Sequence, residues 1–222
     1  MKKTFAIMIF AVIVIFSGCA QKEVKIEGIY SYNADFFTKQ QFSDPFNIDK
    51  GDTTVFGGSI NVNWNIITDI KAKNLFIEKA VGSDTLFENP MMMEFVKEGS
   101  VKEKMEVSGD YFYKLLADNS DVTTVKAFIP EIKIISPAIT DKVKTKDILV
   151  AFNSVQGAQS YSITLKNLKE IPVWERVIVD TTAAYDGEDL VSGVYTLYVT
   201  TSFNIDSIST VKTQSAVQFV VE

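Results

Sequence analysis

The chain has 222 residues, with 28 acidic against 22 basic side chains and a formal net charge of −6. It has no histidine and a single cysteine, and its lysines and arginines form no clustered run. This composition excludes histidine-dependent nucleophilic pairs, histidine-ligated zinc, disulfides within the chain and the basic footprint of a nucleic-acid-binding protein.

Residues 1–18 have the three-part layout of a bacterial secretory signal peptide. Lys2 and Lys3 precede an unbroken apolar run over residues 5–16, and small residues follow that run. As a helix, the twelve apolar residues reach about 18 Å. A bilayer core is about 30 Å thick, so we expect the segment to be cleaved rather than to remain as a membrane span.

The residues Phe16-Ser17-Gly18-Cys19 resemble the lipobox, at which lipoprotein signal peptidase cuts before an acylated cysteine. The resemblance implies that the mature chain begins at Cys19 and carries its membrane anchor there, which is stable when more than one acyl chain is attached. Ala20 rather than aspartate follows the cysteine, which by resemblance to Gram-negative lipoproteins implies the outer membrane. We therefore predict a lipid-anchored protein of the bacterial cell envelope.

Residues 19–42 carry too many aromatic side chains for a purely solvated tether. The aromatic residues are Tyr30, Tyr32, Phe36, Phe37 and Phe42. Two interpretations remain for this segment: it is a lipidated tether with an exposed aromatic surface, or it adds an extra strand to the module that follows.

The rest of the chain has the period-two alternation of half-buried β-strands. The alternating apolar sets are Ile60-Val62-Trp64, Ile148-Val150-Phe152, Tyr161-Ile163-Leu165, Tyr195-Leu197-Val199 and Val217-Phe219-Val221. Turn-forming clusters separate them, namely residues 57–59, 118–121 and 186–189. Short strands with turns between them, and no long amphipathic helix, predict an all-β fold of antiparallel sandwiches.

An internal repeat divides this β-rich part in two. Val107-Ser108-Gly109-Asp110-Tyr111 matches Val191-Ser192-Gly193-Val194-Tyr195, and the strands around Trp64 and Phe152 share the pattern I-x-V-x-aromatic-N. We predict a first module over residues 43–130 and a second over residues 131–222. The linker carries Pro130 and Pro137 without a flexible Gly/Ser run, which favours a stiff end-to-end arrangement.

The second module resembles fibronectin type III and related immunoglobulin-like modules. The resemblance rests on the Gly157-Ala158-Gln159-Ser160-Tyr161 segment and on the Leu190–Tyr195 segment. It implies two tandem immunoglobulin/fibronectin type III-like antiparallel β-sandwiches. It also implies a tyrosine corner, in which Tyr195 buries its ring and its hydroxyl bonds to backbone upstream. Tyr111 is the corresponding candidate in the first module.

No catalytic constellation is evident in the chain. Phosphate-binding glycine motifs are absent, and the carboxylates are scattered over strands and turns. The Asp and Asn clusters at residues 47–52 and 118–121 have the composition of turns, and neither has EF-hand spacing. We therefore predict no enzyme activity, no cofactor and no metal site.

Two functional hypotheses follow. In the first, the chain is a non-catalytic lipoprotein that binds or scaffolds another envelope protein, joined to the membrane by lipid on Cys19. In the second, it binds a glycan by stacking exposed aromatics such as Tyr30, Tyr32 or Trp174 on sugar rings. The sequence identifies neither the partner nor the ligand-binding residues.

Overall fold

The computed structural model describes residues 26–82, 87–118 and 120–222. The first half contains β1 (Gly28–Phe42), β2 (Asp52–Ile66), β3 (Asn74–Val81), β4 (Glu88–Glu94), β5 (Glu98–Met105), β6 (Gly109–Ala117) and β7 (Ser120–Ile129). The second half contains β8 (Ile134–Ser136), β9 (Lys142–Val143), β10 (Leu149–Phe152), β11 (Tyr161–Asn167), β12 (Pro172–Ile178), β13 (Thr182–Ala184), β14 (Gly193–Asn204) and β15 (Thr210–Val221). Two single 3-10 turns complete the assignment, at Ile48–Lys50 and Thr145–Asp147.

The strands form two β-sandwiches of the same design. In the first, strands β1-β2-β5 face the sheet β4-β3-β6-β7, and in the second, strands β8-β10-β13 face β12-β11-β14-β15. The two halves correspond strand for strand, from β1 and β8 to β7 and β15, with β9 as an addition in the second half. This arrangement confirms the predicted all-β class and the repeat of immunoglobulin/fibronectin type III-like sandwiches.

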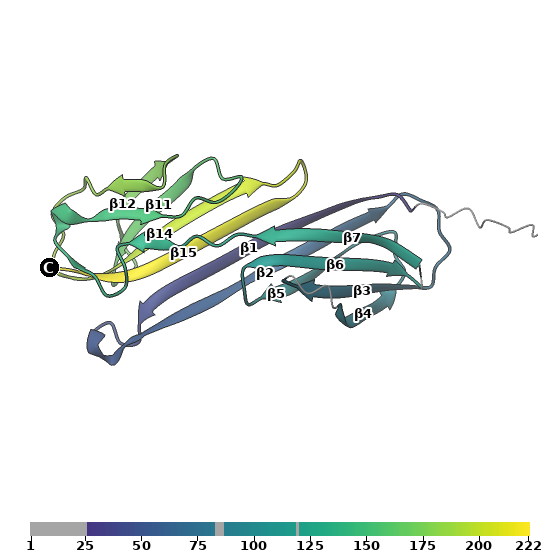
Figure 1. Cartoon of the computed structure of the whole chain (residues 1–222), viewed down its shortest axis with the longest axis horizontal. Helices are drawn as coiled ribbons and strands as arrows, with labels where there is room; N and C mark the ends of the chain where they lie inside the picture. Colours follow the sequence, from purple (N-terminus) through teal and green to yellow (C-terminus); the bar gives the residue numbers. More distant parts are fainter. Residues whose placement is uncertain (1–25, 83–86, 119) are drawn as a thin grey trace, which may run out of the picture.

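A parallel ladder joins the two sandwiches into one sheet. Residues 33–40 of β1 pair in parallel with residues 210–217 of β15, so the order β12-β11-β14-β15-β1-β2-β5 runs through both modules without a break. Figure 1 shows β1 lying between β15 and β2 along much of the molecule. The modules are therefore staggered side by side, which differs from the end-to-end arrangement expected from the linker.

Side chains close this β1–β15 ladder, called the seam below, at both of its ends. The Ser209 hydroxyl accepts a hydrogen bond from the Tyr32 amide at 3.3 Å. At the other end, the Gln218 side-chain oxygen accepts one from the Phe42 amide at 2.9 Å. Between them, the hydroxyls of Thr38 and Ser215 lie 3.0 Å apart across the seam. The pairing is thus specified by side chains about 177 positions apart in the chain.

The hydrophobic core is continuous from one module to the other. Trp64 and Tyr113 belong to its first half, Phe152 and Leu197 to its second, and all four are buried. Ile132, in the linker between β7 and β8, is also fully buried within this cluster. The linker is therefore packed into the core, and burial of its apolar side chain stabilises the junction.

Both predicted tyrosine corners are present. The Tyr195 hydroxyl donates to the Val191 carbonyl at 2.9 Å, and the Tyr111 hydroxyl donates to the Val107 carbonyl at 2.7 Å. Both rings are buried. The repeated V-S-G-x-Y sequence therefore encodes the same corner twice, because the tyrosine lies four positions after the carbonyl that it bonds.

The predicted turn at residues 57–59 is wrong, because these residues lie inside β2. A side chain at Gly58 would collide with the Asp35 carbonyl oxygen, and one at Gly57 would meet the Phe37 ring at 3.0 Å. The glycines therefore permit close approach of β1 and are not turn residues.

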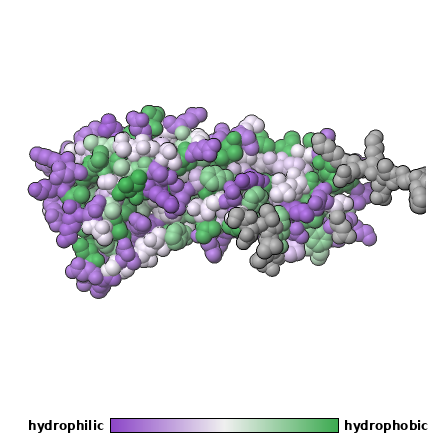
Figure 2. All heavy atoms as spheres, viewed as in Figure 1, coloured by the Kyte–Doolittle hydropathy of each residue, from purple (hydrophilic) through white to green (hydrophobic). Residues whose placement is uncertain are grey.

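The surface of the molecule is mixed in character. On the face shown in Figure 2, hydrophilic residues are dense at the end that carries the C-terminus, and hydrophobic residues are scattered between them. Within the described ranges, no helix is long and apolar enough to cross a bilayer.

Candidate contact surfaces

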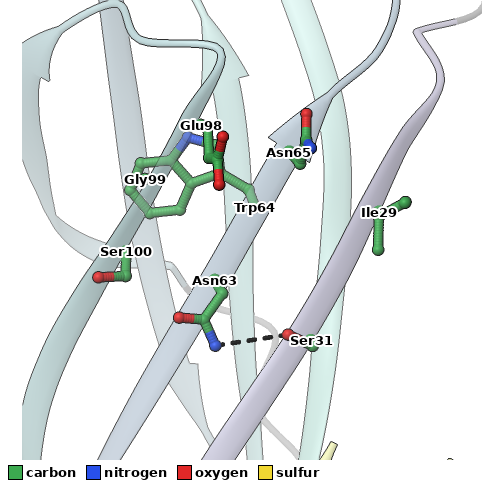
Figure 3. A pocket seen from close by; sticks show the side chains of 8 residues that line it. All are labelled: Ile29, Ser31, Asn63, Trp64, Asn65, Glu98, Gly99 and Ser100. Atoms are coloured by element: carbon green, nitrogen blue, oxygen red, sulfur yellow. Dashed lines mark hydrogen bonds between the residues drawn. The ribbon is translucent and has the colours of Figure 1, made fainter. Parts of the chain in front are cut away.

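A shallow hollow of about 370 Å³ lies on the outer face of the shared sheet, over β1, β2 and β5. Its lining residues are Ile29, Ser31, Asn63, Trp64, Asn65, Glu98, Gly99 and Ser100. Figure 3 shows the Asn63 side chain turned toward Ser31, to which its amide donates a hydrogen bond at 3.4 Å. Asn61 in turn donates to the Asn63 side-chain oxygen at 2.8 Å, so the amides form a short chain along the sheet.

The lining of this hollow is mostly polar. Its floor presents amides and hydroxyls, and Glu98 is the one ionisable residue in its lining. Glu98 has no second carboxylate beside it in this lining, so the pair of acids that flanks a glycosidic bond in glycosidases is not present there. The hollow offers hydrogen-bond donors and acceptors to a partner.

A second surface lies at the hairpin that joins β1 to β2. β2 pairs with β1 over its whole length, but β5 covers only residues 58–65 of its other side. Residues 52–57 of β2, called the free edge below, therefore have no strand beyond them among the described residues. Val55 and Phe56 on this edge are 40% and 53% exposed, and Phe46 in the hairpin turn is 86% exposed.

The aromatic side chains proposed for sugar stacking are in the protein interior. Tyr32 and Trp174 are only 4% and 9% exposed, and Tyr30 packs against the core. The Tyr32 hydroxyl accepts a hydrogen bond from the Phe128 amide at 3.4 Å, and the Trp174 indole donates to Asp186 at 2.8 Å. The glycan hypothesis requires these aromatics to be exposed, and they are not, because the even-numbered face of β1 and the inner face of β12 point into the sandwiches.

Two tyrosines with raised pKa values, Tyr113 and Tyr198, have structural hydrogen-bond partners. Burial, followed by the nearby Glu103 carboxylate, raises the pKa of Tyr113 far above its ordinary value. Lys79 pairs with the same carboxylate at 2.9 Å, at the edge of the first sandwich. Burial and a hydrogen bond to Glu170 raise the pKa of Tyr198 to about 12. Each shift favours the neutral phenol, which suits a structural hydrogen bond better than a nucleophile.

The acidic turn clusters bond to the protein itself. Asp118 accepts hydrogen bonds from the amides of Lys73 and Asn74, and Asp44 pairs with Lys50 at 2.8 Å. Among the described residues, no three acidic or cysteine side chains lie close enough together to share a metal ion. Cys19, the predicted lipidation site, lies outside the described residues.

The free edge was not predicted from the sequence. The only signal for it was the run Asp52-Thr53-Thr54-Val55-Phe56-Gly57, which combines β-branched and aromatic residues without lysine, arginine or proline. Interpreting residues 57–59 as a turn hid the fact that this run belongs to the same strand as Trp64.

Comparison with known proteins finds matches among solved structures. No protein-family model and no curated protein matches the chain. Among solved structures, the chain is similar to fibronectin(III)-like modules of Clostridium thermocellum CbhA, at 12% identity, a TM-score of 0.29, and coverage of 74% of this chain and 85% of that one. It is also similar to a tetra-tandem repeat in the extending region of a large adhesion protein, at 11% identity, a TM-score of 0.22, and coverage of 83% and 50%. The order of strands in the two sandwiches carries the fold assignment.

Proposed function

We propose that this chain is a non-catalytic lipoprotein of the bacterial envelope, anchored in the outer membrane by lipid on Cys19, whose two modules together form a contact module for another envelope protein. The lipobox-like residues before Cys19 support the anchor. The absence of histidine and the structural use of the shifted tyrosines support a non-catalytic role.

The observation that best supports the contact role is the sheet that both modules share. β1 begins near the end of the molecule where the described chain starts, and the turn after it lies toward the opposite end (Figure 1). Its 15 residues span about 50 Å at the usual rise of a strand. A strand held on both sides by neighbours keeps the hairpin turn at a fixed distance from the N-terminal end, as a contact module on an anchored protein requires.

Fractionation of cells that produce the full-length chain tests the anchor. The wild-type protein is expected in the detergent phase and in the outer-membrane fraction, and a Cys19→Ala variant is expected to be soluble or to remain uncleaved. Chemical cross-linking in whole cells tests the contact. With the wild-type protein at its native abundance, a specific envelope protein should be linked to it. A wild-type protein that is soluble, or that is linked to no envelope protein, contradicts the proposal.

A further inference from the structure

The free edge of β2 is a row of backbone groups that a further strand can pair with. A β-strand has hydrogen-bonding groups on both sides, and residues 52–57 use only the side that faces β1. On the other side, β5 ends its pairing with Met105 opposite Gly58. The ladder therefore stops while β2 continues for six more residues.

The outermost strands of the sheets in the described part of the chain carry features that discourage strand addition. β12 contains Pro172 and the charged pair Glu175 and Arg176, β5 contains Lys102, Glu103 and Lys104, and β4 contains Pro90. β7 contains Asp121 and Lys126, and β8 and β13 have three residues each. Lysines, prolines and short length are the usual protection of an edge. The free edge has none of them, and its single charge, Asp52, lies at its end.

The side chains along the free edge define what an added strand must present. Phe56 and Val55 point to opposite faces of the sheet, because neighbouring residues of a strand alternate. Gly57 has no side chain, and the Phe37 ring lies over it at contact distance. An apolar side chain placed opposite Gly57 would therefore rest on the Phe37 ring, in the manner of a cross-strand pair.

A second copy of this chain fits the edge poorly. If two free edges paired antiparallel with Thr54 opposite Thr54, only residues 52–56 of each copy would pair. The hairpin turn of one copy would then begin opposite Gly57 of the other, beside the end of β5 at Met105. The edge is bounded by β5 at one end and by the hairpin turn at the other, so it suits a short segment and not another hairpin with its own β5.

We propose that the free edge binds an extended segment of a partner protein, which adds to the shared sheet as an antiparallel strand in line with β5. The segment is proline-free over about six residues, with apolar side chains opposite Gly57 and Phe56. Main-chain hydrogen bonds supply the register-independent part of the binding, and the apolar side chains select the segment. This inference rests on the proposed contact function and names the surface that performs it.

A synthetic peptide tests the inference on the whole mature chain. The probe alternates valine and threonine between terminal lysines, and a matched peptide has a proline at its centre. Fluorescence anisotropy of the labelled probe should show saturable binding. Hydrogen exchange of the amides of residues 52, 54 and 56 should slow when the probe is added, because these amides alternate with those that face β1. The proline peptide should not bind, because it lacks an amide donor in the ladder.

Variants locate the binding. Val55→Lys should abolish probe binding, whereas Val177→Lys, at a 71% exposed valine on the β12 edge, should leave it unchanged. Thr53→Lys provides a second variant on the free edge if Val55→Lys does not fold by circular dichroism. Failure of the probe to bind the folded wild-type chain overturns the inference, as does binding that both free-edge variants retain. A chain that is dimeric by light scattering and becomes monomeric with Val55→Lys also overturns it, since a second copy would then cover the edge.

The outcome is separable from that of the proposed function. Cross-linking in cells can fail while the peptide still binds the free edge, which would contradict the envelope partner but not the edge as a binding site. Conversely, a partner cross-linked through the polar hollow, together with no peptide binding, would support the contact function and refute the free edge.

Discussion

The Gln218 side chain provides a direct test of whether the two modules form one unit. Its oxygen accepts the Phe42 amide at 2.9 Å, where β1 leaves the seam, and both residues are buried. Gln218→Leu keeps the approximate volume of the side chain and removes the acceptor. A buried donor without a partner costs about 1–3 kcal/mol in the free energy of unfolding. With an m-value of about 2 kcal/mol per molar urea, the unfolding midpoint should fall by about 0.5–1.5 M.

The two tryptophans allow each module to be followed separately. Trp64 belongs to the first module and Trp174 to the second, and both are buried. Replacing one of them with phenylalanine leaves a chain whose fluorescence reports the other. Because one sheet and one core join the modules, the urea transitions of the two single-tryptophan chains should coincide. Gln218→Leu, introduced into each, should lower both midpoints together.

Gln214→Leu is the matched control. Gln214 lies on the same strand, and its side chain donates to Thr200 at 3.1 Å, much as the Gln218 side chain donates to Thr196 at 3.4 Å. Among the described residues the Gln214 side chain makes no hydrogen bond to β1, although its backbone lies in the seam. Gln214→Leu should therefore lower the unfolding midpoint by less than Gln218→Leu. The reasoning is refuted if the transitions of the two parent chains separate, or if Gln218→Leu lowers only the Trp174 midpoint.

Three further predictions concern the anchor and the tyrosines. Cys19→Ala should prevent labelling of the protein by a clickable palmitate analogue in growing cells, and persistent labelling would exclude Cys19 as the lipid site. In urea melts, Tyr195→Phe should lower the free energy of unfolding by only about 1 kcal/mol, because Val191 is exposed and water can hydrate its carbonyl. Tyr195→Ala should lower it by about 3–5 kcal/mol, because this change also opens a cavity. Tyr198 is half-buried, so Tyr198→Ala should lower the free energy of unfolding by less than Tyr195→Ala. A larger loss of stability with Tyr198→Ala would contradict the assignment of the inner face. The folded-state pKa of Tyr198 is raised to about 12 from 10.0, so the contribution of the neutral Tyr198 phenol to stability should be present below pH 10 and lost as the pH rises toward 12. Glu170→Gln should move the phenolate absorbance of Tyr198 to lower pH. An unchanged titration would show that the Glu170 carboxylate has no role.

Local patterns predicted much of the fold. Alternation identified the strands around Trp64 and Tyr195, since a half-buried strand must place apolar residues at every second position. The V-S-G-x-Y repeat identified both corners, because the bond between tyrosine and carbonyl spans only four positions. The predicted boundaries at residues 42/43 and 130/131, and lipidation at Cys19, stay predictions.

The seam and the free edge could not be predicted in this way. The seam pairs residues about 177 positions apart, and its parallel register has no counterpart in the local sequence. The segment before residue 43 has apolar residues at even positions from Tyr30 to Phe36, but this alternation does not indicate which strand lies beside it. The free edge depends on where β5 ends relative to β2, which is a property of the assembled sheet and not of either strand.

The parallel sense of the seam determines how the molecule responds to a mechanical pull. β1 enters the seam from its N-terminal side and β15 leaves it toward the C-terminus, so the two ends of the described chain, residues 26 and 222, lie beyond opposite ends of the ladder. Tension between them would act along the strands and would strain the pairs from Asn33–Thr210 to Gln40–Val217 together, in shear. An antiparallel pair of terminal strands would instead unzip one pair at a time. Unfolding under force is governed by the unfolding barrier rather than by equilibrium stability. In shear, many hydrogen bonds must break together before the chain crosses that barrier. Stretching along the line between the ends of the described chain is therefore opposed by the whole seam at once.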